Sequence, residues 1–400
     1  MSLFASVELV PGDPILGLTE AYNADPRTQK VNLGVGIYYD EQGRIPLLDC
    51  VRQVEQALAA AGKPRGYLPI DGLAAYAAAT RELVFGKESE LVAAGRVATT
   101  QTVGGRGALR VGADLLKKLL PHATIAISNP SWENHRAVFG AAGFDIVDYT
   151  YFDAATHGLD FAGMLADLDQ LKPGTVVLLH ACCHNPTGVD PTREQWQRIV
   201  QVFARRPLIA FLDFAYQGFG RGVEEDAFAV RTFASAGLEM IVSNSFSKNF
   251  GLYRERVGAL TVVTGADQEA TAVMSRIKQT VRANYSNPPA HGGKVVELVL
   301  GDADLRSLWE REVVEMRDRI HDMRRLFVET LKLYGVKQNF DFLLEQQGMF
   351  SFSGIGKEQV RRLREQYGIY IVENGLINVA AMTRARMDYL CRSIAEVLER

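Results

Sequence analysis

Cysteine is scarce in this chain of 400 residues, and its placement excludes two classes of site. The four cysteines are Cys50, Cys182, Cys183 and Cys391. None belongs to a C-x-x-C pair, so the spacing supports neither a disulfide framework nor a zinc site, and we expect no metal. Unpaired cysteines in this number are typical of the reducing cytoplasm, where we expect the protein to reside.

Hydrophobic runs of membrane length and an excess of charge are also missing. No stretch of about 18 apolar residues occurs, and the start, MSLFASVELVPGDP, lacks the basic segment and apolar core of a secretory signal. The 44 Lys and Arg residues nearly balance the 47 Asp and Glu residues, which leaves a net charge of -3. We therefore expect neither a membrane nor a nucleic acid as a partner.

What is present is the composition of a soluble globular protein, with 47% hydrophobic and 23% charged residues. From residue 97, short apolar runs alternate with segments of helical pattern. Runs that are apolar on both faces and separated by helices predict an α/β fold with a mainly parallel sheet between helices. The seven expected strands are Val97–Val103, Thr124–Ser128, Ile146–Thr150, Thr175–His180, Leu208–Asp213, Met240–Phe246 and Val257–Val263.

After Asp302 the pattern becomes α+β, which predicts a second, smaller domain. A long amphipathic helix at Ala303–Tyr334 precedes a helix at Lys357–Tyr367, strands at Ile369–Val372 and Ile377–Ala381, and a last helix to Arg400. The N-terminal segment has no core of its own, so we expect it to join this domain. The predicted division is an arm at 1–11, a small domain of 12–45 and 310–400, and a large domain of 46–309.

Residues suited to chemistry follow the predicted strands, where open α/β sheets bind ligands. Lys248 lies among small polar residues after one strand and suits a Schiff base with pyridoxal phosphate. Asp213 could pair with the pyridine nitrogen of that cofactor. Each residue alone has an ordinary structural explanation, but their order on successive strands favours the functional one. The other candidates are Asn185 and Tyr216 for the ring hydroxyl, and Gly104, Gly105, Ser245 and Arg256 for the phosphate.

The chain resembles the class I aminotransferases of fold type I, in the aspartate and aromatic-amino-acid group, and looks most similar to the bacterial aromatic enzymes. The resemblance runs nearly end to end. It rests on DPILGL (13–18), VNLGVGIYYDE (31–41), RGYLPIDG (65–72), NPSWENH (129–135), HACCHNPTG (180–188), LDFAYQGF (212–219), SNSFSKNFGLYRERVGAL (243–260), RANYSNPPAHG (282–292) and GMFSFSG (348–354).

The resemblance implies roles for individual positions. Lys248 matches the lysine that holds pyridoxal phosphate and moves the substrate proton. The cofactor-binding positions it implies are Gly104, Gly105, Arg106, Trp132, His135, Asn185, Asp213, Tyr216, Ser245, Ser247, Lys248, Arg256 and, reaching the neighbouring subunit, Tyr67. The substrate-binding positions are Val35, Gly36, Trp132, Asn185, Leu376 and, crossing the subunit interface, Arg282. A homodimer with shared active sites is implied.

The resemblance also implies the reaction. We expect pyridoxal-phosphate-dependent transamination between an aromatic or dicarboxylic L-amino acid and a 2-oxo acid such as 2-oxoglutarate. Ile37, Tyr39 and Ile45 resemble the apolar pocket mouth of the aromatic-accepting members, although they equally suit simple packing. The alternatives are a different reaction on the same cofactor and an inactive binding protein on the same fold. The set of cofactor residues argues against an inactive protein.

Two positions depart from the family pattern. Arg106 replaces a small hydroxyl residue, and it could add a charge to the phosphate or point to solvent. Leu376 replaces the arginine that grips the substrate α-carboxylate, and leucine donates no hydrogen bond. Three explanations are open: a substrate without an α-carboxylate, such as an amine; a carboxylate held by another group, with Arg106 a distant candidate; or a weakened ordinary aminotransferase.

Overall fold

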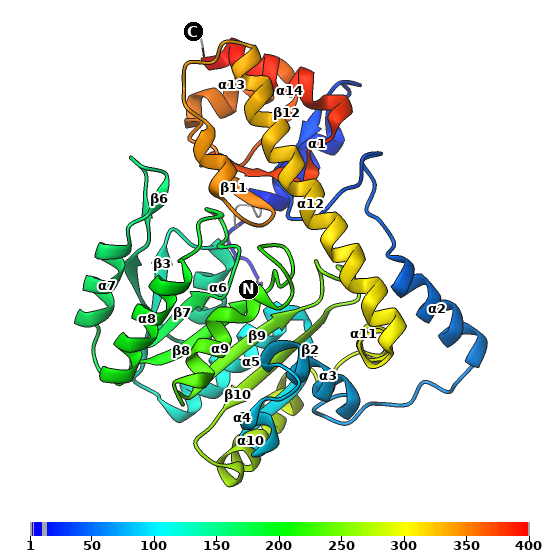
Figure 1. Ribbon diagram of the computed structural model, residues 1–400, viewed down its shortest axis with the longest axis vertical. Coiled ribbons are helices and arrows are strands. Elements are labelled where there is room, and N and C mark those ends of the chain that lie inside the picture. Colours follow the sequence, from blue (N-terminus) through cyan, green and yellow to red (C-terminus); the bar gives the residue numbers. More distant parts are fainter. Residues whose placement is uncertain (1, 3, 10–13, 399–400) are drawn as a thin grey trace.

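Seven strands form the central sheet of the computed structural model, which describes residues 2, 4–9 and 14–398. Across the sheet the strands follow the order β2, β10, β9, β8, β7, β3, β4 (Figure 1). This arrangement confirms the expected α/β fold and seven-stranded sheet. The strands are β2 Val97–Val103, β3 Thr124–Asn129, β4 Asp145–Thr150, β7 Val176–His180, β8 Ile209–Phe214, β9 Met240–Ser245 and β10 Val257–Val263.

Strand β10 runs antiparallel to both of its neighbours, β2 and β9, whereas the pairs from β9 to β4 are parallel. The expectation of a helix between every two strands is therefore wrong for β9 and β10, which are joined by the loop at 246–256. A parallel return needs a crossover of about a dozen residues or more. This shorter loop reverses the chain, so β10 begins at the edge where the parallel strands end.

Helices cover both faces of the sheet. On β7, Val176 and Leu178 belong to an apolar cluster with α5, α6 and α10, whereas Val177 and Leu179 belong to a second cluster that includes α8, α9 and α11. The helices of this part are α2 Asp49–Ala61, α3 Ala74–Phe85, α4 Glu90–Ala93, α5 Gly104–Leu119, α6 Glu133–Ala141, α7 Phe161–Gln170, α8 Arg193–Arg205, the 3-10 turn η1 Glu225–Ala227, α9 Phe228–Ser235, α10 Asp267–Asn284 and α11 Ala290–Gly301.

Helix α5 packs closely against the sheet because it carries Gly112. A Cβ at this position would lie 2.7 Å from the Phe211 ring on β8. A glycine inside a helix costs about 1 kcal/mol relative to alanine, so the close approach must offset that cost. Its consequence is that the first residues of α5 lie at the sheet edge, beside Ser245 of β9.

A second group of elements lies at the other end of the molecule (Figure 1). Both chain ends build it, since Val31 pairs in parallel with Ile369. Helix α12 passes through residue 310, so the boundary predicted there falls within one continuous helix. The elements are α1 Pro14–Ala24, β1 Val31–Asn32, α12 Ala303–Leu333, the 3-10 turn η2 Asp341–Glu345, β11 Phe350–Phe352, α13 Lys357–Tyr367, β12 Ile369–Tyr370, β13 Leu376–Asn378, the 3-10 turn η3 Val379–Ala381 and α14 Arg384–Leu398.

The strand expected at Ile377–Ala381 is only partly correct, because β13 ends at Asn378 and a 3-10 turn follows. The side chain of Asn378 accepts from the Ala380 N–H at 3.0 Å and donates to the Ile37 carbonyl at 2.8 Å. This side chain competes with ladder pairing and bends the chain. Residues 1, 3, 10 and 11 of the predicted arm, residues 12 and 13 of the predicted small domain, and residues 399 and 400 lie outside the described residues. The division into domains stays a prediction.

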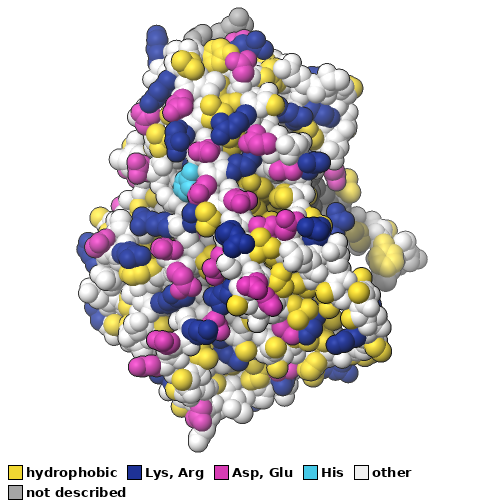
Figure 2. Space-filling model, turned by 45° about the vertical axis from the view of Figure 1, so that its right-hand side comes forward, with side chains coloured by type: hydrophobic (Ala, Val, Ile, Leu, Met, Phe, Trp, Pro, Cys, Tyr) yellow, Lys and Arg dark blue, Asp and Glu magenta, His cyan; other side chains and the backbone are white. Residues whose placement is uncertain are grey.

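A short hairpin, β5 Phe152–Asp153 with β6 Gly158–Leu159, projects from the sheet region. On the face shown in Figure 2, basic and acidic side chains are interspersed rather than gathered into one patch. Within the described residues, no helix combines the length and the apolar character needed to cross a bilayer.

Candidate active site

Polar residues from neighbouring strands meet at the carboxyl edge of the sheet. Asp213 on β8 lies in register with His180 at the end of β7 and with Ser243 on β9. Lys248 follows in the turn after β9. A cavity of about 360 Å³ opens there, and Asp213 and Lys248 both line it. The cavity lies where the parallel strands end, the edge at which open α/β sheets bind ligands.

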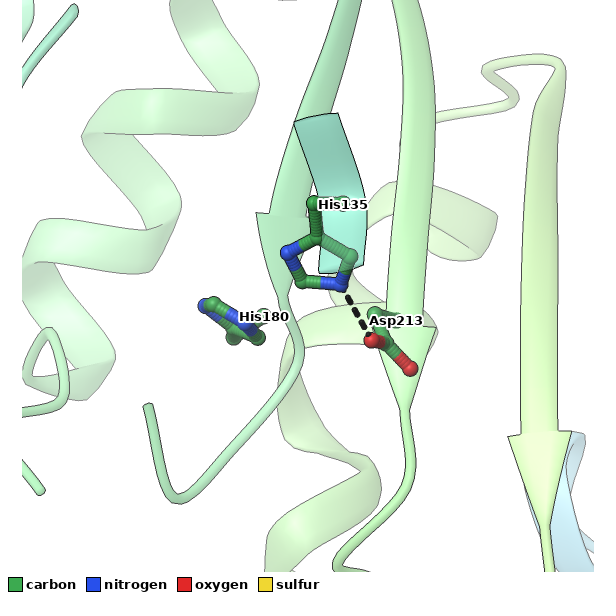
Figure 3. A group of neighbouring side chains, drawn as sticks. All are labelled: His135, His180 and Asp213. Carbon is green, nitrogen blue, oxygen red and sulfur yellow. Dashed lines mark hydrogen bonds and ion pairs between the residues drawn. The ribbon is translucent and has the colours of Figure 1, made fainter. Parts of the chain in front are cut away.

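Asp213 is buried and hydrogen-bonded through both carboxylate oxygens. His135 Nε2 lies 2.8 Å from one oxygen (Figure 3), and Ser243 Oγ donates to the other at 3.2 Å. Ser131 Oγ lies 2.9 Å from His135 Nδ1 and orients the ring. Burial raises the pKa of Asp213, but the His135 hydrogen bond and the neighbouring cationic groups outweigh burial and hold the pKa below its usual value. The carboxylate is therefore ionised at neutral pH.

Lys248 presents a largely buried amine whose Nζ lies 5.0 Å from the centre of the Tyr216 ring. The pKa of Lys248 is lowered to about 8, chiefly by burial; Asp213 opposes this shift, and the charges of Arg256 and Arg106 add to it. An amine with this pKa is unprotonated in a minor but useful fraction at neutral pH. It can then act as a nucleophile and as a base.

A cradle of small residues and one arginine lies beside Lys248. A Cβ at Gly104 would lie 2.4 Å from Arg256 Nη2, and a Cβ at Gly105 would lie 2.8 Å from Ser245 Cβ. Arg256 Nη1 donates to Ser247 Oγ at 3.4 Å. The two glycines begin α5; the Gly104 N–H donates to the Arg256 carbonyl at 2.9 Å, and the next N–H groups have no partner within the helix. The N–H groups that follow Gly104 in the first turn, two hydroxyls and a guanidinium are the donor set that a phosphate group requires.

Tyr216 and Asn185 form a hydrogen-bonded pair that also lines the cavity. Asn185 Nδ2 donates to the Tyr216 hydroxyl at 3.2 Å, and both side chains are buried. Burial raises the pKa of Tyr216. The phenol therefore keeps its proton and can donate it in a hydrogen bond to an oxygen of a bound molecule.

The opposite side of the cavity, which we call the uncharged wall, comes from the second group of elements. Leu376 on β13 is 6% exposed and Phe350 on β11 is also 6% exposed. None of these lining side chains carries a charge. The residues of the uncharged wall are Gly34, Gly36, Phe350, Val372, Asn374 and Leu376.

Most of the residues singled out from the sequence lie around this one cavity. Those that line it are Gly36, Gly105, Arg106, Trp132, Asn185, Asp213, Tyr216, Ser245, Ser247, Lys248, Arg256 and Leu376. Gly104 and His135 lie directly behind the lining, against Arg256 and Asp213. Five others do not line the cavity of this chain: Val35, Ile37, Tyr39, Ile45 and Tyr67. Arg282, also absent from the lining, donates to Ser286 Oγ on the surface.

Sequence reasoning missed His180, Ser131, Tyr253 and Phe350, which also line the cavity. His180 had a signal, because it ends a strand whose neighbour carries Asp213 at the same level. Burial lowers the pKa of His180 to about 3, so this ring is neutral beside His135 (Figure 3). No sequence pattern indicated Phe350, because its position in the cavity depends on how the two groups of elements pack.

A family model described as "Aminotransferase class I and II" matches residues 28–394. The chain belongs to this family. The aspartate aminotransferase of Pseudomonas aeruginosa is 56% identical over 398 residues, with both chains fully covered. The aromatic-amino-acid aminotransferase of Escherichia coli is 47% identical and covers 99% of this chain and 100% of its own. A crystal structure of the Burkholderia pseudomallei aromatic-amino-acid aminotransferase, covalently bound to pyridoxal phosphate, has a TM-score of 0.98 at 56% identity, with full coverage of both chains.

The protein is therefore a fold type I aminotransferase that uses pyridoxal phosphate to move an amino group from an amino donor to a 2-oxo acid. The donor set around the cavity fits this cofactor: the cradle suits its phosphate, Asp213 its ring nitrogen and Tyr216 its ring oxygen. When bound, pyridoxal phosphate supplies an electron-accepting ring and an aldehyde that condenses with amines.

Proposed function

We propose that the donor is an aromatic or dicarboxylic L-amino acid and that the acceptor is a 2-oxo acid such as 2-oxoglutarate. The names of the relatives at 56% and 47% identity support both donor classes. The cavity favours the aromatic class, because Trp132, Tyr216 and Phe350 all line it. Aromatic side chains of this kind offer apolar area and edge-to-face contacts to a substrate ring.

The observation that carries the proposed mechanism is a lowered lysine pKa beside an ionised, hydrogen-bonded aspartate. We assign Lys248 the transfer of a proton from the substrate Cα and back to it, since its amine is unprotonated in a useful fraction near neutral pH. Asp213 holds negative charge where the ring nitrogen of the cofactor would lie, and His135 keeps it ionised. Ser245, Arg256 and the start of α5 would fix the phosphate.

We further propose a cytoplasmic homodimer with shared active sites. Tyr67 is 95% exposed, and neither Tyr67 nor Arg282 lines the cavity of its own chain. These positions suit residues that complete the site of a partner subunit, as the family resemblance implies. All four cysteines are buried free thiols, which supports a reducing compartment.

The uncharged wall favours a second candidate donor, a primary amine without an α-carboxylate. A carboxylate placed against Leu376 would meet no hydrogen-bond donor from that side chain. An unpaired charge that loses its water is unstable, so an amine such as 2-phenylethylamine would suit this part of the cavity. This candidate shares the cofactor chemistry and differs in the donor alone.

A comparison of matched donors separates the two candidates. Phenylalanine and 2-phenylethylamine differ only by the carboxylate, and aspartate represents the dicarboxylic class. Single-turnover bleaching of the cofactor absorbance measures each half-reaction. We expect kcat/KM to be at least tenfold higher for phenylalanine than for 2-phenylethylamine. A higher value for the amine would replace the amino-acid proposal with the amine proposal.

A further inference from the structure

Three cationic side chains line the active-site cavity: Arg106, Lys248 and Arg256. Two of them already have an assigned role there. Arg256 is held by Ser247 and packs against Gly104 in the cradle, and Lys248 is the reactive amine. Arg106 differs, since among the residues that the structure describes its guanidinium has neither a hydrogen-bond partner nor an ion pair.

Arg106 is nevertheless held in a definite place. Its guanidinium carbon lies 5.2 Å from the centre of the Trp132 ring, which lines the same cavity. Trp132 follows β3. In the sheet, β8 and β7 separate β3 from the strands β2, β10 and β9, next to which the cradle residues lie. A cation over an aromatic ring is attracted to the ring face and keeps its N–H donors available to another group. The stacking therefore draws Arg106 to the Trp132 side of the cavity.

The anions of the cavity do not neutralise Arg106. Asp213 is occupied by His135 and Ser243. Glu133 lines the rim, is exposed, and forms no ion pair with Arg106. The charge of Arg106 instead acts on other cations, since it contributes to the lowered pKa of both Lys248 and Arg256. Arg106 is thus an unneutralised cation within electrostatic reach of the reactive amine.

The substrates of the reaction require such a cation. Every 2-oxo acid acceptor carries a carboxylate, and a carboxylate that leaves water needs charge-assisted hydrogen bonds to offset desolvation. The uncharged wall supplies none at Leu376. The planar fork of an arginine matches a carboxylate through two parallel hydrogen bonds.

We propose that Arg106 binds the carboxylate of the substrates, so that the cation of this subsite comes from the start of α5 rather than from position 376. The inference rests on the proposed amino-acid transamination and names the residue that selects for a carboxylate. Arg106 is a specificity-determining residue, and Trp132 is its positioning residue.

The direct test is the binding of a carboxylate that cannot react. 3-Phenylpropionate has the skeleton of phenylalanine without the amine, and 3-phenylpropanamide is its uncharged match. Calorimetry on the holoenzyme, in excess pyridoxal phosphate, measures both affinities for the wild type and for Arg106→Gln. We expect Arg106→Gln to weaken the binding of 3-phenylpropionate by about 10- to 100-fold, the range of a charge-assisted hydrogen bond. Binding of 3-phenylpropanamide should change less than about threefold.

Two further variants control the charge and its geometry. Arg110→Gln removes the same charge one turn along α5, where Arg110 pairs with Asp114 outside the cavity. This variant should bind 3-phenylpropionate like the wild type. Arg106→Lys keeps the charge but loses the fork, so its affinity should lie between those of the wild type and Arg106→Gln. Arg106 is exposed, so these changes leave the core of the fold untouched.

Retention of pyridoxal phosphate on dialysis decides between the substrate carboxylate and the cofactor phosphate. If Arg106→Gln retains pyridoxal phosphate like the wild type but binds 3-phenylpropionate more weakly, the inference is supported. Weakened retention, with or without an effect on 3-phenylpropionate, overturns it in favour of a phosphate role. No change in either measurement also overturns it and leaves Arg106 as a solvent-facing residue.

Failure of the inference can be distinguished from failure of the proposed function. If Arg106→Gln and the wild type use phenylalanine equally well, the assignment of Arg106 is wrong and amino-acid transamination stands. If the wild type uses 2-phenylethylamine but neither phenylalanine nor aspartate, the proposed donor class is wrong, and with it the need for a donor carboxylate site.

Discussion

Replacement of Asp213 by asparagine tests the electrostatic centre of the site with little change of shape. Asparagine keeps one oxygen for the proton of His135, which lies 2.8 Å from the carboxylate at present. Its amide nitrogen would face Ser243 Oγ, which now donates to the second carboxylate oxygen at 3.2 Å and can rotate to accept. The substitution therefore removes a charge and retains most of the hydrogen bonds.

The expected effect follows from that lost charge. Two opposite unit charges about 4 Å apart interact by about 4 kcal/mol at an effective dielectric constant of about 20. If this interaction stabilises the protonated ring nitrogen during the reaction, its loss slows the chemical step by about a thousandfold. The fold should survive, because the carboxylate and the amide have nearly the same volume.

Single-turnover absorbance changes with saturating phenylalanine and excess pyridoxal phosphate measure the chemical step. Asp226→Asn is the matched control: Asp226 is also a buried carboxylate, held by the N–H groups of Gly218, Gly220 and Arg221, and it does not line the active-site cavity. This control should keep a near-normal rate. A rate for Asp213→Asn within tenfold of the wild type would refute the assigned role of Asp213.

Three further predictions concern the cations of the cavity. Lys248→Ala should bind pyridoxal phosphate without the yellow absorbance of the lysine-bound form and should lose transamination by several orders of magnitude; measurable steady-state turnover would contradict this. In the apoenzyme, covalent attachment of pyridoxal phosphate should accelerate as pH rises through about 8, the lowered pKa of Lys248, because the unprotonated amine attacks. Arg106→Gln should move that midpoint upward, since it removes a nearby cation, and Arg110→Gln should not; stopped-flow absorbance decides. Finally, adding Leu376→Arg to the Arg106→Gln variant should raise its kcat/KM for phenylalanine at least tenfold. Leu376→Arg alone should raise the kcat/KM of the wild type by a smaller factor, because two guanidinium groups then share one cavity.

The sheet was predictable because its signals are local. Each of the seven strands is a short run apolar on both faces, and such runs need no information about the rest of the chain. The direction of β10 could not be predicted in this way, because the apolar run of Val257–Val263 suits either orientation. The length of the preceding loop decides it. The strand at Ile377–Ala381 failed for another reason: Asn378 reaches across to carbonyls of a segment far away in sequence.

The candidate site shows the same limit. Asp213, Lys248 and Asn185 follow strands of one sheet, so strand order alone brings them together. Phe350 and Leu376 meet them only because a second group of elements folds over the sheet edge. Sequence reasoning identified position 376 through the family resemblance rather than through any pattern of its own. The stacking of Arg106 on Trp132 is a side-chain contact, and no spacing in the sequence indicates it.

The position of the carboxylate cation determines what substrate binding does to the two walls of the cavity. The cradle combines the start of α5 with Ser245 on β9 and Arg256 before β10. Arg106 lies in the same first turn of α5, so a carboxylate bound to Arg106 would be held by the same body that holds the cofactor phosphate. A ligand shifts a conformational equilibrium only through contacts that differ between the two states. The carboxylate would then contribute little to any approach of the uncharged wall toward the sheet. That approach would depend on the apolar part of the substrate against Phe350 and Leu376, which favours donors with a large aromatic side chain over small ones.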